Sequence, residues 1–256
     1  MNIGIVGTGE MGSALARKFA GAGHAVRIAN SRGHDGARAA AEASGAEADD
    51  VEGVMGMAEV LILAMPFPSA AQLPKALLQR LDAGTIVVDV ANYFPDIRDP
   101  HIADVDAGMP ESVWISHKIG RPVVKAFNSV LFHTLDRLGT AEGTPGRLAI
   151  PVAADDDHAR QIVMGLVEDA GFDPVDAGPL EESWRQEPLT PVYCCDYGAA
   201  LTRRALAAAV RGKAAGIRDR QWWPAHLRLF ADNPSYERVH GAQIALNRSL
   251  NPVDSW

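Results

Sequence analysis

The chain has 256 residues, enough for one large domain or for one domain and a smaller lobe. Hydrophobic residues account for 47% of the sequence and charged residues for 22%, the proportions of a water-soluble globular protein. Because 32 acidic residues outnumber 24 lysines and arginines, the net charge of −8 argues against a nucleic acid or an anionic membrane as a partner.

The sequence up to residue 176 alternates between patterns typical of strands and of helices. Residues Asn2–Val6 form a short apolar run, and Glu10–Gly21 carries apolar side chains at helical spacing. Further strands are predicted at residues 24–29, 59–66, 85–90, 123–127, 148–153 and 172–176, and further helices at residues 36–43, 51–57, 71–81, 111–119 and 155–170.

Strands that are separated by helices predict the fold class. Continuous apolar runs such as residues 59–66 are typical of parallel strands that helices cover on both faces. We therefore expect an α/β fold of the Rossmann type, with a doubly wound and mainly parallel sheet, over residues 1–178.

The character of the sequence changes after about Gly178. Residues 181–213 are predicted to be helical, and the tail that follows is too rich in aromatic residues for a disordered linker. We expect residues 179–256 to form a helical C-terminal lobe that packs on the sheet domain or on a second subunit. The aromatic residues of this tail include Trp222, Trp223, Phe230, Tyr236 and Trp256.

A glycine-rich loop, Gly7-Thr8-Gly9-Glu10-Met11-Gly12, lies between the first predicted strand and the first predicted helix. In such a loop Gly7 permits a tight turn, Gly9 lets the backbone approach a pyrophosphate, and Gly12 lets the helix pack close to the strand. The helix N-terminus then offers free N–H groups and the positive end of a dipole to the phosphates. The position of the loop predicts that its six residues bind a dinucleotide.

The end of the second strand distinguishes between the two nicotinamide cofactors. A site for NAD usually places a carboxylate there, whereas an arginine accommodates the 2′-phosphate of NADP. Here the sequence reads Asn30-Ser31-Arg32, and no carboxylate follows until Asp35. The three residues are therefore predicted to bind the adenosine ribose and its phosphate, and the cofactor is predicted to be NADP(H).

The ends of two further strands are also candidates for contact with the cofactor. Met65, Pro66 and Phe67 lie at the end of the strand at residues 59–66, and Ala91 follows the strand at residues 85–90. Both places lie at the carboxyl edge of the predicted sheet, where open α/β folds bind ligands. The proline-rich stretch at residue 66 is equally well interpreted as a simple strand terminator.

Several blocks together resemble the family of NADPH-dependent deazaflavin oxidoreductases, which exchange a hydride with the 8-hydroxy-5-deazaflavin coenzyme F-420. They are residues 1–32, 124–129 (Val-Lys-Ala-Phe-Asn-Ser), 150–157, 176–180 and 187–191. The resemblance implies that Ser31 and Arg32 hold the 2′-phosphate and that residues 124–129 lie beside the nicotinamide. It covers roughly residues 1–200, and residues 216–256 do not map onto the family.

One position inside these blocks departs from part of the family. Archaeal members carry a histidine where this chain has Asn128, whereas bacterial relatives and the related NADPH–flavin domains of membrane metalloreductases use asparagine. The resemblance therefore implies hydride exchange between NADPH and a stacked ring, with a deazaflavin or a flavin as the small-molecule co-substrate.

Asn128 is the candidate catalytic residue, because its amide could orient the nicotinamide or bind the acceptor ring. Ser129 and Phe127 are expected to shape the wall beside it. Transfer between two stacked rings requires mainly positioning and the exclusion of water. No metal is predicted, because the histidines do not show the spacing of metal ligands.

Two other functions fit the same cofactor half. An NADPH-dependent reductase of an imine or a carbonyl in a small metabolite needs a proton donor, and it predicts that Lys213, His133 or Tyr197 reaches the nicotinamide. A non-catalytic NADPH-sensing protein predicts binding without turnover and a C-terminal lobe that binds a partner protein.

The remaining features bear on location and assembly. No stretch reaches the ~18 uninterrupted apolar residues of a membrane span, and no basic segment precedes an apolar one at the N-terminus. Cys194 and Cys195 are adjacent and are expected to be reduced thiols that fill space in a helix. These features favour a cytoplasmic protein, and the apolar surface of the aromatic tail is consistent with a homodimer.

Overall fold

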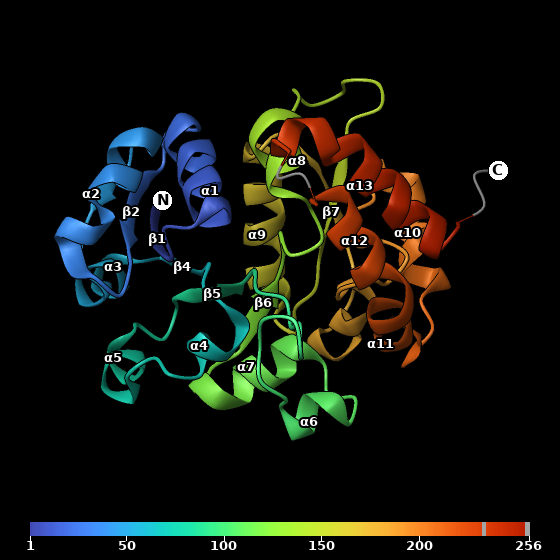
Figure 1. The fold of residues 1–256 in the computed structure, drawn as a ribbon. Coiled ribbons are helices and arrows are strands. Elements are labelled where there is room, and N and C mark those ends of the chain that lie inside the picture. Colours follow the sequence, from blue (N-terminus) through green and yellow to red (C-terminus); the bar gives the residue numbers. More distant parts are fainter. Residues whose placement is uncertain (232–233, 254–256) are drawn as a thin grey trace.

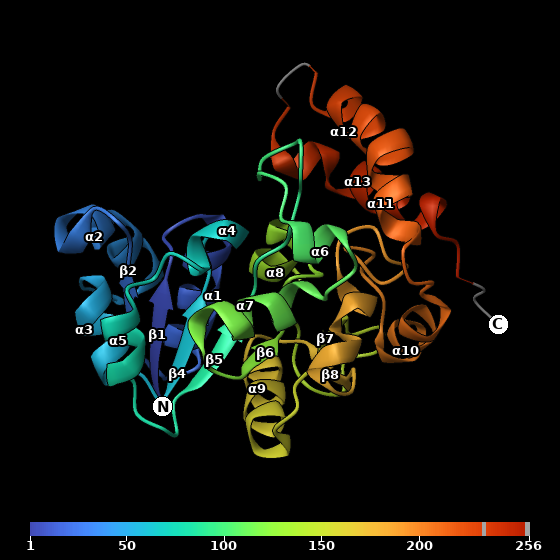
Figure 2. The ribbon, with the colours of Figure 1, turned by 90° about the horizontal axis from the view of Figure 1, so that it is seen from below.

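The computed structural model describes residues 1–231 and 234–253. Trp256, which we expected to belong to the C-terminal lobe, therefore lies outside the described part of the chain. Six parallel strands form the main sheet in the order β3-β2-β1-β4-β5-β6 (Figures 1 and 2). The order reverses between β1 and β4, as in a doubly wound fold. The strands are β1 (Asn2–Val6), β2 (Ala25–Ala29), β3 (Glu47–Ala48), β4 (Val60–Leu63), β5 (Ile86–Asp89) and β6 (Val123–Lys125).

Helices cover both faces of this sheet. On one face α1 (Glu10–Gly21), α2 (Gly33–Ser44), α8 (Phe132–Arg137) and α9 (Asp157–Asp169) enclose one apolar core, and Figure 1 shows α1 and α9 side by side. The other core contains side chains of α3 (Val51–Met57), α4 (Phe67–Ala70), α5 (Lys75–Arg80) and α7 (Glu111–Ile119). The expected α/β Rossmann-type fold is confirmed.

The buried strands supply both cores through alternate residues. Ile62 belongs to the core under α1, whereas its neighbours Leu61 and Leu63 belong to the core under α3. All three side chains are fully buried. This explains why the strand reads as a continuous apolar run rather than as an alternating pattern.

The last two strands do not extend the main sheet as expected. β7 (Ala149–Val152) and β8 (Asp173–Asp176) pair in parallel as a separate sheet. A single antiparallel bridge between Lys125 and Ala153 connects this pair to the end of β6. Residue Phe127 follows with a φ of 60°, so the chain turns away before a second ladder can form.

The helix expected over residues 181–213 is interrupted. A 3₁₀-helix covers Leu180–Gln186, an irregular segment follows, and α10 spans only Ala199–Ala208. Pro188 and Pro191 lie in the irregular segment, where proline cannot supply the N–H groups of a helix. Cys194 and Cys195 are buried free thiols, but they lie in this segment and not in a helix as expected.

Proline also divides the helix expected over residues 71–81. Its first half is irregular after α4, and α5 begins only after Pro74, which forms its N-terminal boundary. A short helix, α6 (Ala103–Asp106), lies outside every element that the sequence predicts. Such short helices carry too few residues to show a clear period.

The C-terminal lobe packs on the rest of the chain. It contains α11 (Lys213–Ile217), a π-helical turn (Arg218–Trp222), α12 (Trp223–Leu229) and α13 (Tyr236–Leu250). In Figure 2, α12 and α13 lie on the side to which the strand arrows point. Trp222 stacks on Phe94, which lies in the loop after β5, with 5.8 Å between ring centroids. The same side chain donates to Asn247 Oδ1 of α13 at 3.0 Å.

This packing removes one reason to expect a homodimer. Trp222 is 7% exposed and is covered by its own chain, including Trp223 and His226.

Within the described residues, no helix is both long and apolar enough to cross a membrane.

Replacing Trp222 tests how the lobe is attached. Trp222→Ala removes the ring between Phe94 and α13, and we expect a loss of about 3–5 kcal/mol in the free energy of unfolding. Chemical denaturation measures the change. The matched control is Leu227→Ala in α12, because Leu227 is 51% exposed and its loss should cost little. An equal effect of both substitutions would contradict the proposed attachment.

Candidate functional site

The glycine-rich loop brings three backbone segments close together. Gly7 has a φ of +129°, and a Cβ atom there would collide with the carbonyl group of Ala64, at the end of β4. A Cβ atom at Gly12 would collide with the carbonyl group of Gly7. Gly9 differs from both, because a Cβ atom built there would meet no described atom within 4 Å. The structure therefore packs Gly7 and Gly12 tightly and leaves open space beside Gly9.

Asn30 ties the end of β2 to this loop. Its amide donates to Thr8 Oγ1 at 2.8 Å and to the Gly36 carbonyl oxygen at 2.8 Å, and its Oδ1 accepts the N–H of Arg32 at 2.8 Å. Ser31 and Arg32 are exposed beside it. The Arg32 guanidinium makes one long hydrogen bond, at 3.4 Å to the carbonyl oxygen of Gly36. Asn30 thus shapes the turn, and Ser31 and Arg32 face outward.

A cleft of about 370 Å³ lies at the carboxyl ends of the strands. Its walls come from the starts of α1 and α8, from the loops after β4, β5 and β6, from the irregular segment near Cys194, and from α13. Parallel α/β sheets bind ligands at this edge. The cleft is lined by Gly9, Glu10, Met11, Ala64, Met65, Pro66, Val90, Ala91, Asn92, Phe94, Arg98, Phe127, Asn128, Val130, Leu131, Phe132, Tyr193, Cys194 and Tyr236.

Eight of the residues that the sequence indicates line this cleft together, and Ser129 does not: Gly9, Glu10, Met11, Met65, Pro66, Ala91, Phe127 and Asn128. Phe67 is not among the residues that line the cleft. Its ring is 0% exposed and packs against Tyr93 and Trp114, with centroid distances of 5.4 and 5.1 Å. The side chain after Pro66 points into the core because α4 begins there.

The Asn128 amide is engaged within the protein. It is 2% exposed, and its Nδ2 donates to Asn92 Oδ1 at 3.0 Å and to the Gln186 carbonyl oxygen at 2.7 Å. Its Oδ1 accepts from Gln186 Nε2 at 3.1 Å. Asn92 returns a hydrogen bond of 2.8 Å to the backbone carbonyl of Asn128. The side chain therefore holds the loop after β5 against the loop after β6, at the floor of the cleft.

A buried charged network lies directly behind this floor. Lys125 is 0% exposed, and its ammonium donates to the Ala91 carbonyl oxygen at 2.6 Å, to Asp89 Oδ2 at 3.2 Å and to Glu111 Oε2 at 3.3 Å. Burial alone would lower the pKa of Lys125, but the carboxyl groups of Asp89 and Glu111 raise it above its ordinary value. Burial raises the pKa of Glu111 well above its ordinary value, against the opposite effect of Lys125.

The backbone is strained at two residues of the cleft. Phe127 has a φ of 60° and Cys194 a φ of 50°, and Asp196 nearby has a φ of 49°. Left-handed conformations of such residues cost about 1–3 kcal/mol each and persist where surrounding contacts impose them. For Cys194 and Asp196, helix α13 supplies such contacts, because Asn247 donates to the Cys194 carbonyl at 3.0 Å and Arg248 to the Asp196 carbonyl at 2.7 Å.

The sequence did not indicate the aromatic half of the cleft. Phe94, Phe132, Tyr193 and Tyr236 all line it, and they come from four separate segments. Tyr236 lies at the start of α13 and makes an edge-to-face contact with Phe132 at 6.1 Å. Burial raises the pKa of Tyr236 to about 12, so its hydroxyl keeps its proton at neutral pH. No local pattern links these residues, because tertiary packing alone brings them together.

The proton donors expected for an imine or carbonyl reductase lie elsewhere. Among the described residues, the cleft lining includes none of Lys213, His133 and Tyr197. Lys213 lines a different hollow, and His133 packs against His240 with 4.6 Å between ring centroids. Tyr197 lies under the Arg248 guanidinium.

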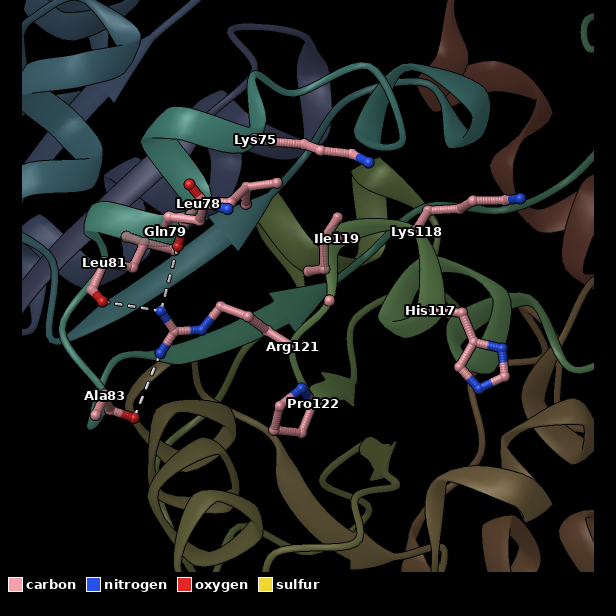
Figure 3. A pocket seen from close by; sticks show the side chains of 11 residues that line it. Lys75, Leu78, Gln79, Leu81, Ala83, His117, Lys118, Ile119, Arg121 and Pro122 are labelled. Carbon is pink, nitrogen blue, oxygen red and sulfur yellow. Dashed lines mark hydrogen bonds between the residues drawn. The ribbon is translucent and has the colours of Figure 1, made fainter.

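A larger hollow, of about 660 Å³, lies at the opposite edge of the sheet (Figure 3). Its walls include residues just before β5 and β6. Figure 3 shows the guanidinium of Arg121 turned toward the carbonyl groups of Leu81 and Ala83, with which it forms hydrogen bonds of 3.0 and 3.3 Å. Arg121 is thus used to join two loops at the edge where parallel sheets do not bind ligands. Within residues 1–231 and 234–253, no three His, Cys, Asp or Glu side chains form a group that could hold a metal ion.

Comparison with known proteins gives consistent matches. The family model "NADP oxidoreductase coenzyme F420-dependent" matches residues 2–93. The protein YjhV of Escherichia coli (strain K12) is 43% identical over 110 residues, which are 43% of this chain and 76% of YjhV. The region after residue 93, with the C-terminal lobe, lies outside the family match.

Two solved structures share the fold over most of their length. The hypothetical protein SMa0349 from Sinorhizobium meliloti is 27% identical, with a TM-score of 0.61, over 78% of this chain and 92% of that chain. A protein from Arthrobacter sp. FB24, described as a candidate F420-dependent NADP reductase, is 25% identical, with a TM-score of 0.59, over 71% of this chain and 86% of that chain.

The glycine-rich loop, the sheet order and these matches agree with the resemblance seen in the sequence. The chain belongs to the family of coenzyme F420-dependent NADP oxidoreductases.

Proposed function

We propose that this NAD(P)-dependent oxidoreductase transfers a hydride between NADPH and a deazaflavin or flavin ring bound in the 370 Å³ cleft. The observation that carries the proposal is the composition of this cleft. Residues indicated for the cofactor line it together with four aromatic side chains. A cavity lined by both a cofactor loop and aromatic rings suits two planar rings that stack.

The residues present fit NADP(H). The open space beside Gly9 leaves room for a pyrophosphate, and the first N–H groups of α1 lack carbonyl partners one turn earlier. Arg32 and Ser31 are exposed at the end of β2, where a 2′-phosphate would lie. Arg32 would donate paired hydrogen bonds to that phosphate, and Ser31 would add a hydroxyl.

The chain's contribution to the reaction is positioning. NADPH supplies the hydride when it is bound. Ala91 and the Asn92–Asn128 pair form a rigid floor, because both asparagine side chains are held by hydrogen bonds. Asn128 contributes by holding that floor in place, because both hydrogens of its amide are donated to Asn92 and Gln186. Phe132 and Tyr236 close the cleft from the side of the lobe and exclude water from the rings.

One observation favours the reduction of a carbonyl or an imine as a second candidate. Tyr193 and Tyr236 line the cleft, and each carries a phenolic proton that it could donate. The proton-donor positions expected from the sequence do not line the cleft. We prefer a deazaflavin or flavin acceptor because four aromatic rings, Phe94, Phe132, Tyr193 and Tyr236, are among the residues that line the cleft.

Absorbance of NADPH tests the choice of acceptor. The purified chain is mixed with NADPH and offered a deazaflavin, FMN, FAD, or a panel of imines and ketones. We expect NADPH to be oxidised with at least one ring acceptor. Turnover with a carbonyl or an imine and none with any ring would overturn the proposal, and binding of NADPH without any turnover would favour a sensing role.

Gly9→Val tests whether the open space beside Gly9 holds phosphate. Gly9 has a φ of −73°, which valine can adopt, and nothing within 4 Å in the described structure would oppose a Cβ atom. We expect the melting temperature to change little, while NADPH binding weakens about 100-fold because two or more charge-assisted hydrogen bonds are lost. Isothermal titration calorimetry measures the affinity.

Gly21→Ala at the other end of α1 is the control for this variant, because a Cβ atom there also meets nothing within 4 Å. It should leave the affinity for NADPH unchanged. Normal NADPH binding by Gly9→Val would show that the phosphates lie elsewhere.

Arg32→Ala tests the preference for NADPH. Loss of the guanidinium should weaken NADPH binding about 10- to 100-fold and leave NADH binding nearly unchanged, because only NADPH carries the 2′-phosphate. Arg38→Ala is the matched control, since Arg38 is exposed on α2, the helix that begins directly after Arg32, and pairs with Asp35. Equal losses of affinity for NADPH and NADH after Arg32→Ala would show that Arg32 does not bind the 2′-phosphate.

A further inference from the structure

We propose that Lys125 is a positioning residue for the hydride transfer, because its buried ammonium fixes the Ala91–Asn92 backbone at the floor of the cleft. Since this role requires that the cleft holds the nicotinamide, it rests on the proposed function. The family match ends at residue 93, and the resemblance in the sequence places residues 124–129 beside the nicotinamide without giving Lys125 a role of its own.

The hydrogen bonds of the ammonium are complete. A lysine ammonium has three donors, and Lys125 directs them to the Ala91 carbonyl oxygen and to the carboxyl groups of Asp89 and Glu111. The bond to the carbonyl, at 2.6 Å, is the shortest of the three. Burial of an ion costs several kcal/mol unless such partners compensate, so the side chain has little freedom to move.

The two carboxyl groups hold the same stretch of backbone. Asp89 Oδ1 accepts the N–H of Ala91 at 3.0 Å, and Glu111 Oε1 accepts the N–H of Tyr93 at 3.1 Å. Together with the bond from Lys125, three backbone groups of residues 91–93 point into the network. Asn92 lies between them and directs its side chain to Asn128 across the floor of the cleft.

The position of the network favours a role beyond stability. Replacement of buried ion pairs by apolar residues is often neutral or stabilising, so such a group in itself adds little to folding. Here every backbone group that it binds belongs to the segment that begins the cleft wall after β5. Lys125 also lies at the end of β6, three residues before Asn128, so one strand connects the network to the floor.

Lys125→Met tests the role through the mobility of the bound nicotinamide. The reduced ring fluoresces, and its emission anisotropy reports how firmly the ring is held without any acceptor present. At saturating NADPH we expect the anisotropy of Lys125→Met to fall toward that of free NADPH. The affinity for NADPH should stay within about threefold, because the phosphate loop and Arg32 are unchanged. With an acceptor, the rate of hydride transfer should fall about 10- to 100-fold.

Thr85→Val is the matched control, because it removes a buried hydrogen bond of 3.0 Å to Ala58 at the other end of β5. It should lower the melting temperature without changing the anisotropy. If Lys125→Met does not fold, Lys125→Gln serves in its place. Its amide keeps two donors for the carboxyl groups on a side chain that is one bond shorter, and the same fall in anisotropy is expected.

The outcomes separate the two proposals. Absence of a bound NADPH signal in the unmodified chain would reject the proposed function itself. A normal signal that Lys125→Met or its substitute leaves unchanged, or that Thr85→Val lowers equally, would reject only the positioning role. Complete loss of NADPH binding in the lysine variant would also reject it, because the role concerns the nicotinamide end of the cofactor alone.

Discussion

The close approach of backbone at Gly7, Gly12 and Ala64 is the constraint on which the site depends. With no room for a Cβ atom at either glycine, the start of α1 is pressed against the ends of β1 and β4. The free N–H groups of α1 therefore face the carboxyl edge of the sheet, where the loops after β4, β5 and β6 also end. Gly9 lies in the same loop but beside open space. Gly7 and Gly12 thus allow close packing of the backbone, whereas Gly9 leaves room for a ligand.

Several unfavourable features of the fold lie around the cleft. A lysine is buried with carboxyl groups behind its floor, and Phe127 and Cys194 hold left-handed backbone conformations in its walls. The C-terminal lobe imposes part of this geometry, since Asn247 and Arg248 of α13 bind the strained segment and Tyr236 lines the cleft. The lobe thus completes the second half of the site as well as covering the core. Such local costs are common where a protein fixes the geometry of a reaction.

Local patterns predicted the parts of the molecule that local chemistry determines. The glycine spacing, the apolar strands and the polar end of β2 each depend on a few consecutive residues, and the sheet with its helices follows from them. The burial of the Phe67 ring was not foreseen, because a strand end does not reveal which side chain turns into the core. The helix expected over residues 181–213 failed at Pro188 and Pro191. Partners of Lys125 lie 36 and 14 residues away, and Tyr236 reaches the cleft only through the packing of the lobe, so no sequence spacing could indicate them.

The central claim is that one cleft holds the nicotinamide of NADPH beside an aromatic acceptor site. A crystal structure of the chain with NADP⁺ tests it most directly. We expect the 2′-phosphate against Arg32, the pyrophosphate over Gly9, and the nicotinamide on the floor formed by Ala91 and the Asn92–Asn128 pair, with free space remaining beside Tyr236. A nicotinamide bound outside this cleft, for example in the hollow beside Arg121, would contradict it.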